Sequence, residues 1–309
     1  MSGQGPDFFA IGPAKSGTSW LLHHLGRHPQ VRRPWVKNIN FFDAADLHTF
    51  VADARRLTTH RNYGNYFDLY DGSNLAGFEH VVKLRRTIRT ENFLRDARVA
   101  LRERNTGGLL HIVKCWSLPR QLTQDHVDRY RRWLFESAPG KISGDLSTNN
   151  FTLSRRAIEL IARTSPNLRV IMGIRNPIER RWSFLRMDHV LRGGSGGPPV
   201  FDLSELRRPD PEGDYRGAIS NWTEFFPPGQ IHFAFFDELR ANPFQYLQGI
   251  YDFLGIAFAP GMVDLTPRQK GIDWPLSDEA ERTLRERSGE QIQFLKSYFP
   301  NNPHVQSWS

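Results

Sequence analysis

A short segment near the start of the chain carries the residue types that an anion-binding loop needs. It runs from Gly12 to Ser19 as Gly-Pro-Ala-Lys-Ser-Gly-Thr-Ser, after the apolar run Asp7–Gly12. Small residues let the backbone close around an oxyanion, and the first free N–H groups of a following helix point toward it. A positive charge comes from Lys15, and hydroxyl donors come from Ser16, Thr18 and Ser19. The segment suits a phosphate or sulfate; a glycine turn without a ligand is the alternative.

The order of these residues differs from that of a Walker A loop. Walker A places Lys directly after the last Gly and follows it with a Ser or Thr that holds magnesium. Here Lys15 precedes Gly17 by two positions, and Thr18 follows Gly17. A P-loop nucleotide kinase is therefore a less favoured alternative.

The loop has to be positioned by a strand before it and a helix after it, which is the opening unit of an α/β fold. Short apolar runs predict strands at Asp7–Gly12, Leu109–Val113, Arg169–Ile174 and Ile231–Phe236. Amphipathic patterns predict helices at Thr18–Arg27, Asp46–Leu57, Lys83–Arg104, Gln124–Ser137, Ser154–Thr164 and Ser277–Tyr298. We therefore expect an α/β protein with a central, mainly parallel sheet of about five strands, helices on both faces and a P-loop-like nucleotide site.

Composition limits the class of protein. The chain has 309 residues, 39% of them hydrophobic and 24% charged, which is ordinary for a globular protein. The single cysteine excludes a disulfide framework. No apolar run approaches the roughly 20 residues of a membrane-spanning helix, and no signal sequence is expected in the polar first residues. We expect one domain, residues 1–309, in the cytoplasm.

Charge favours an anionic partner. Lys and Arg number 41 against 33 Asp and Glu, which gives a formal net charge of +8. A basic surface attracts phosphates, sulfates and nucleic acids. We expect a small-molecule or carbohydrate partner rather than nucleic acid; an arginine-rich nucleic-acid binder is a third alternative. No His-Glu-x-x-His motif occurs, and we expect no metal.

The segment Pro13–Leu21 resembles the 5′-phosphosulfate loop of sulfotransferases that use 3′-phosphoadenosine 5′-phosphosulfate (PAPS). His28-Pro29 and Phe41-Phe42-Asp43 also resemble that family at similar spacing, with carbohydrate and bacterial sulfotransferases the nearest in character. The resemblance implies that the loop holds the 5′-phosphosulfate through five residues: Lys15, Ser16, Gly17, Thr18 and Ser19.

Two later segments resemble the family's 3′-phosphate site. Arg175 follows the apolar run Val170–Ile174, and Ser183 comes eight positions later. The resemblance implies that both bind the 3′-phosphate, which suits the fork of an arginine side chain. Near the C-terminus, Arg268-Gln269-Lys270-Gly271 resembles the loop that closes over the same phosphate, which implies a role for Arg268, Lys270 and Gly271.

The expected general base is missing. Carbohydrate sulfotransferases carry a Lys-Glu pair ahead of their Phe-Phe pair, and the Glu acts as the base. Here Lys37 matches the Lys, and the family likeness makes it a catalytic candidate, but Asn38 stands at the Glu position. An amide cannot take a proton at neutral pH. Asp43, Asp145 or a histidine remain candidates for the base, and an already ionised acceptor is the alternative.

The resemblance implies transfer of a sulfuryl group from PAPS to a hydroxyl or amine, with PAP as the product. A non-catalytic protein that binds PAP or another polyanion is the alternative. Only Gly144–Ser147 resembles a family segment within residues 46–168, and this region is expected to recognise the acceptor. The segment 192–199, rich in Gly and Pro, is expected to form a flexible loop.

Overall fold

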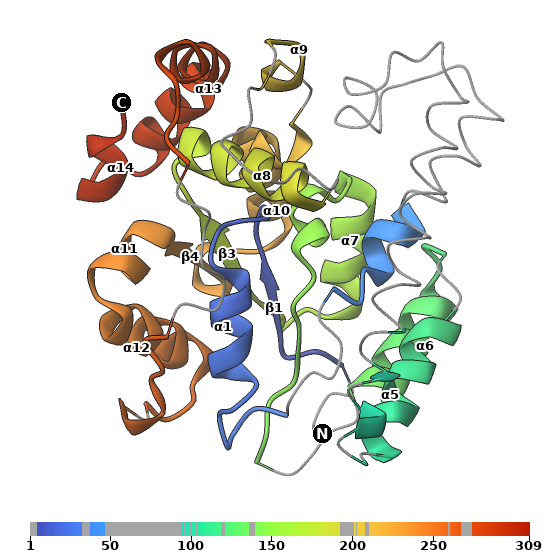
Figure 1. Ribbon diagram of the computed structural model, residues 1–309. Coiled ribbons are helices and arrows are strands. Elements are labelled where there is room, and N and C mark those ends of the chain that lie inside the picture. Colours follow the sequence, from blue (N-terminus) through green and yellow to red (C-terminus); the bar gives the residue numbers. More distant parts are fainter. Residues whose placement is uncertain are drawn as a thin grey trace, which may run out of the picture.

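A four-stranded parallel sheet lies at the centre of the computed structural model (Figure 1). The structure describes residues 5–32, 38–46, 106–118, 121–135, 140–191, 210–258, 260–266 and 274–309, with short pieces inside 94–104 and 201–207. The strands are β1 (Phe8–Ile11), β2 (Gly144–Asp145), β3 (Arg169–Ile174) and β4 (Ile231–Phe235), in the order β2-β1-β3-β4. The α/β prediction is confirmed, with four strands in the described residues where about five were expected.

Alternate residues of β1 separate two hydrophobic cores. Phe8 and Ala10 pack toward α1 (Thr18–Leu25) and α12 (Pro243–Leu254). Phe9 and Ile11 pack into the larger core on the other face of the sheet. That larger core is built from α6 (Gln124–Leu134), α7 (Arg155–Thr164), α10 (Tyr215–Phe225) and α13 (Asp278–Tyr298). Because both faces are covered, the parallel strands are mostly apolar; the exceptions are Asp145, Arg169 and His232.

The remaining elements are shorter or lie at the edges of these layers. They are α5 (Thr106–Ser117), α8 (Pro177–Leu191), α9 (Leu203–Leu206), α11 (Phe236–Ala241), α14 (Pro303–Ser307) and the 3₁₀ turns η1 (Thr148–Thr152), η2 (Pro211–Gly213), η3 (Pro228–Gln230) and η4 (Pro260–Met262). No helix in the described part of the chain is long and apolar enough to cross a membrane.

The predicted strand Leu109–Val113 is wrong, because these residues belong to α5. Ile112 and Cys115 are buried, three positions apart, whereas Leu110 and Val113 are 57% and 44% exposed. This is the spacing of one helical face. A short run of four apolar residues around His111 fits a strand and a helix equally, so the local pattern alone favoured the wrong element.

Most of the predicted helices are confirmed within a few residues. Ser154 caps α7 and Ser277 caps α13, each by accepting a hydrogen bond from the backbone N–H three residues later. Of the predicted helix Asp46–Leu57 the structure describes only Asp46, at the end of a helical stretch over residues 41–46. Most of Lys83–Arg104 and all of the glycine-rich segment 192–199 lie outside the described residues.

Candidate functional site

The loop between β1 and α1 lies at the carboxyl edge of the sheet, where parallel strands present their ligands. Gly12 has φ 147°, and a Cβ there would come within 3.0 Å of the backbone of Gly173 on β3. Gly17 has φ 88° and precedes α1, whose N-terminus has no side-chain cap. The first N–H groups of α1 are therefore not capped by the residue that begins it, as an anion site requires. We call Gly12–Gly17 the donor loop.

Ser16 stabilises the donor loop from within. Its hydroxyl donates to the carbonyl of Pro13 at 2.8 Å, and the side chain is only 1% exposed. A Cβ on Gly173 would meet the Ser16 Oγ at 2.7 Å, so the serine packs directly against β3. Thr18 and Ser19, the other predicted hydroxyl donors, lie in the first turn of α1.

Lys15 lies at the centre of a group of cations. Its φ of 76° is in the left-handed region, and its Nζ lies 3.8 Å from Met187 Sδ on α8. Burial lowers the pKa of Lys15, and the positive charges of Arg175 and Arg186 lower it further. An anion at this position would offset that repulsion.

Arg175 connects the two sequence segments that predicted the site. Its Nη1 donates to the backbone carbonyl of Lys15 at 2.8 Å, across 160 positions of sequence. Nη2 donates to Glu179 at 3.1 Å, and the guanidinium lies 4.2 Å from the ring centre of Phe236. The side chain is 8% exposed, and its Nε has no hydrogen-bond partner in the described structure. A buried donor without a partner fits an anionic ligand.

Tyr215 fixes the strand end that carries Arg175. Its hydroxyl donates to the backbone carbonyl of Arg175 at 2.9 Å. Burial raises the pKa of Tyr215 to about 12, so the phenol stays protonated and keeps this bond. Ser183 lies half-buried on α8, on the same helix as Arg186 and Met187. The predicted residues Lys37, Arg268, Lys270 and Gly271 lie outside the described residues.

The carboxylates suggested as bases are largely engaged elsewhere. Asp145 is fully buried and accepts hydrogen bonds from Tyr130 at 2.7 Å and Ser147 at 2.5 Å. Asp43 is 2% exposed and accepts from Asn149 Nδ2 at 3.2 Å. Neither side chain is presented openly to an acceptor molecule.

Asn38 has a structural role that a glutamate would not fill as well. Its φ is 58°, and its Oδ1 accepts hydrogen bonds from the backbone N–H and the hydroxyl of Thr148 at 3.2 and 3.3 Å. Asn tolerates this left-handed backbone better than Glu does. The two hydrogen bonds from Thr148 to Asn38 therefore connect residues 38–46 to η1.

Sequence analysis missed three charged residues around the donor loop. Arg186 lies three positions after Ser183 in α8, so helical spacing was a usable signal. Arg240 reaches Glu179 at 3.0 Å from α11. Glu212 accepts a hydrogen bond from the N–H of Ala14 at 2.5 Å, across 198 positions, and no local pattern points to this contact.

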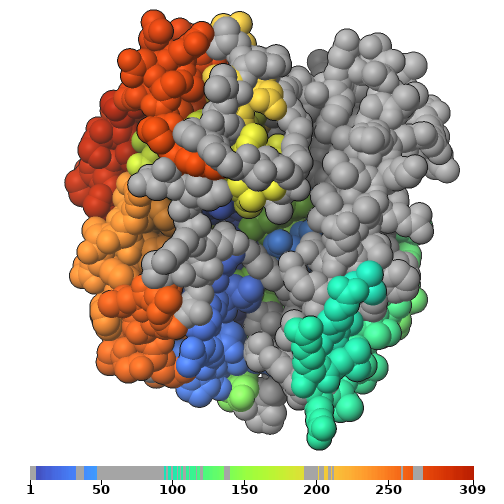
Figure 2. All heavy atoms as spheres, in the orientation of Figure 1, coloured from blue at the N-terminus to red at the C-terminus, as the bar shows by residue number. Residues whose placement is uncertain are grey.

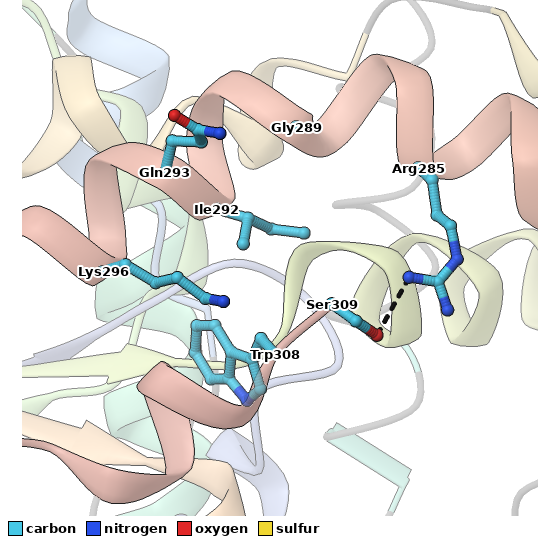
Figure 3. Close-up of a pocket in the computed structure, with 7 residues that line it drawn as sticks. All are labelled: Arg285, Gly289, Ile292, Gln293, Lys296, Trp308 and Ser309. Atoms are coloured by element: carbon cyan, nitrogen blue, oxygen red, sulfur yellow. Dashed lines mark hydrogen bonds between the residues drawn. The ribbon is translucent and has the colours of Figure 1, made fainter.

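The face of the molecule drawn in Figure 2 is hollowed near its centre. Figure 2 shows a recess with blue atoms from the N-terminal segment inside it, below the yellow atoms near the end of α8. A different pocket of about 330 Å³ lies between α13 and the C-terminal residues, lined by Ile292, Lys296 and Trp308 among others (Figure 3). That second pocket contains no donor-loop residue.

His24 and His28 have the spacing of paired metal ligands on a helix, but their ring nitrogens are already bonded. His24 contacts the carbonyl of Trp20 at 2.9 Å and the N–H of Asp264 at 3.0 Å. His28 contacts the carbonyl of Ala257 at 2.7 Å and the N–H of Gln30 at 3.1 Å. Among the residues that the structure describes, no group of three His, Cys, Asp or Glu is placed to hold a metal.

The fold has a parallel sheet with a glycine-containing loop between its first strand and the helix that follows. The sulfotransferase family model matches residues 6–260, most of the chain. The chain therefore belongs to the sulfotransferase family.

One solved structure supports the fold. The sulfotransferase of Alicyclobacillus acidocaldarius is 16% identical, with a TM-score of 0.55, over 97% of this chain and 98% of that chain. The sulfotransferase domain of the Synechococcus PCC 7002 olefin synthase is 13% identical, with a TM-score of 0.45, over 94% and 97%. At these identities the first likeness shows the fold alone. A search of curated proteins finds no match.

Proposed function

We propose that this sulfotransferase moves a sulfuryl group from PAPS to a hydroxyl or amine of a small-molecule or carbohydrate acceptor and releases PAP. The observation that carries the proposal is the contact of Arg175 with the Lys15 carbonyl at 2.8 Å. It brings together the two segments that resemble the phosphate sites at opposite ends of one nucleotide. The orphaned Nε of Arg175 supports the fit of an anion there.

In this proposal the chain's own groups divide the work. The N–H groups of Lys15, Gly17 and the first turn of α1, together with the hydroxyls of Thr18 and Ser19, hold the 5′-phosphosulfate. Arg175 and Ser183 hold the 3′-phosphate. Bound PAPS supplies the sulfuryl group, and the chemistry leaves negative charge on the oxygen that bridged to the 5′-phosphate. Lys15 Nζ donates a hydrogen bond to that oxygen as the charge develops.

Replacing Arg175 with Ala tests the assignment of the 3′-phosphate. Calorimetry would titrate PAP and adenosine 5′-monophosphate, which lacks the 3′-phosphate, into wild type and variant. We expect the variant to bind PAP about 10–100-fold more weakly, the effect of losing charged hydrogen bonds, and the monophosphate within about threefold of wild type. Arg216→Ala is the control. Arg216, on α10, also lies over a phenylalanine ring, that of Phe294, but it is not among the residues assigned to the nucleotide.

Two results would contradict the proposal at different levels. If wild type gave no heat with PAP, the nucleotide site itself would be wrong. If Arg175→Ala weakened both nucleotides equally, the residue would support the loop rather than bind the 3′-phosphate. Binding of PAP without any transfer from PAPS to alcohols, phenols or amines would leave a PAP-binding protein.

A further inference from the structure

We propose that Glu212 is the catalytic base that removes the proton of the acceptor, in place of the glutamate that position 38 lacks. The inference rests on the proposed sulfuryl transfer. In the described part of the chain, Glu212 is the only carboxylate hydrogen-bonded to the donor loop, through the N–H of Ala14 at 2.5 Å. That bond holds the carboxylate against the backbone of the donor loop, one residue before Lys15.

The carboxylate of Glu212 has one oxygen available. Oε2 accepts the Ala14 N–H, whereas Oε1 has no hydrogen-bond partner among the described residues. The side chain is partly exposed, unlike Asp43 and Asp145. A base must reach the proton that it removes, so accessibility separates Glu212 from the buried acids.

The turn that carries Glu212 is anchored on both sides. Before it, Asp210 pairs with the fully buried Arg180. After it, Asp214 caps α10 by accepting from the N–H of Gly217 at 2.9 Å, and Tyr215 bonds to the carbonyl of Arg175. A base held on a fixed turn keeps its geometry through the reaction.

The same turn also lies against the element that Asn38 binds. η2 contacts η1, and η1 begins at Thr148, which donates two hydrogen bonds to Asn38. The turn that carries Glu212 therefore packs against η1, the element that Asn38 binds. In the proposed step the acceptor proton moves to Oε1. The new acceptor–sulfur bond forms as the bond from sulfur to the 5′-phosphate oxygen breaks, and its electron pair stays on that oxygen beside Lys15.

Glu212→Gln tests this role, because Gln keeps an oxygen for the Ala14 N–H but cannot take the proton. Sulfur-labelled PAPS would be offered with N-acetylglucosamine, an alcohol, and with p-nitrophenol, which is largely ionised near pH 8. Transfer to the alcohol should fall about 10²–10⁴-fold, the usual contribution of a base. Transfer to the ionised phenol should fall by less than about tenfold, because it has no proton to lose.

Binding of PAP gives a second readout that does not depend on turnover. Removing a negative charge beside the phosphate loop should leave PAP affinity unchanged or raise it up to about tenfold. Glu290→Gln, an exposed position on α13, is the matched control for both assays.

Each outcome decides between roles. If Glu212→Gln lost PAP affinity together with activity, or lost activity equally with both acceptors, Glu212 would be a support of the loop and the proposal would be wrong. Alcohol transfer within threefold of wild type would also overturn it. A wild type that transfers to neither acceptor would refute the proposed function with these acceptors, whereas an active wild type with an unaffected variant would refute only the role of Glu212.

Discussion

The two sides of the candidate site are held together by different means. On the donor side, backbone geometry and cations dominate: Gly12 and Gly17 shape the loop, and Lys15 lies near Arg175 and Arg186. On the other side, which we propose to face the acceptor and call the acceptor side, the acids Asp43, Asp46 and Asp145 are buried and accept hydrogen bonds. We call these three residues the acid cluster. The donor side presents positive charge that an anionic ligand would neutralise. The carboxylates of the acid cluster instead accept hydrogen bonds within the protein.

This difference explains why a carboxylate's position along the sequence is a poor guide to its role. Asp145 directly resembles a family segment, yet both of its oxygens accept hydrogen bonds within the protein. Glu212 resembles nothing, yet it contacts the donor loop. A buried acid whose oxygens are both bonded stabilises local structure, whereas a partly exposed acid with one oxygen unbonded can accept a proton.

Apart from Glu212→Gln, the largest effect is expected for Lys15→Ala, which removes the ammonium from the donor side. The turnover of PAPS should fall about 10²–10³-fold, as for the loss of one stabilising donor at a developing charge. Ala at φ 76° carries the same backbone strain as Lys, so the comparison isolates the charge. Initial rates of PAP release at saturating acceptor would measure the effect.

The pH dependence of PAP binding by wild type also tests whether the Lys15 ammonium binds the anion. Because the pKa of Lys15 is lowered from 10.5, the ammonium loses its proton at a lower pH than a free lysine. PAP affinity should therefore decline as pH rises toward 10, and the decline should be absent in Lys15→Ala. Lys296→Ala, on α13, is the control. An identical alkaline decline in wild type and Lys15→Ala would show that another group binds the anion.

A smaller effect, on stability rather than catalysis, is expected for Asp46→Asn in the acid cluster. Asp46 is fully buried and bonded to the N–H and hydroxyl of Ser154, and burial raises its pKa from 3.8 to about 6. Between those values the folded protein holds a proton that the unfolded chain lacks. The contribution of Asp46 to the free energy of unfolding thus falls as pH rises from about 4 to 6, by about 3 kcal/mol.

Asp46→Asn should lack that slope. Urea unfolding from pH 4 to 7 would give the difference in free energy between variant and wild type, which should shift in favour of the variant as pH rises. Asp252→Asn, at an exposed site on α12, is the control. If the difference in free energy of unfolding between variant and wild type stayed constant across this range, Asp46 would be charged throughout. Burial of its carboxylate would then not destabilise the folded protein.

The same contrast separates what the sequence predicted from what it did not. β1, the donor loop and α1 follow from local apolar patterns and glycine, and they lie within two residues of prediction. Arg175 was found through family likeness. That it lies near Lys15 could be expected only because the resemblance assigns the two residues to the two phosphate sites of one nucleotide. The Glu212–Ala14 bond depends on how η2 packs, which no local pattern encodes. β2 has two residues, too few for periodicity to indicate a strand.

The smallest effect is expected for Asn38→Glu, which restores the family's glutamate on the acceptor side. The change places Glu at φ 58° and removes the amide oxygen that Thr148 binds, so the free energy of unfolding should fall by about 1–2 kcal/mol. Asn38→Asp is the matched control, since Asp keeps an acceptor oxygen and tolerates the left-handed backbone; it should lose under about 0.5 kcal/mol. Turnover with an alcohol acceptor should not rise in either variant, because Glu212 already serves as the base. Faster transfer by Asn38→Glu than by wild type would mean that the acceptor proton faces position 38. The base would then lie on the acceptor side, and the assignment of this role to Glu212 beside the donor loop would be wrong.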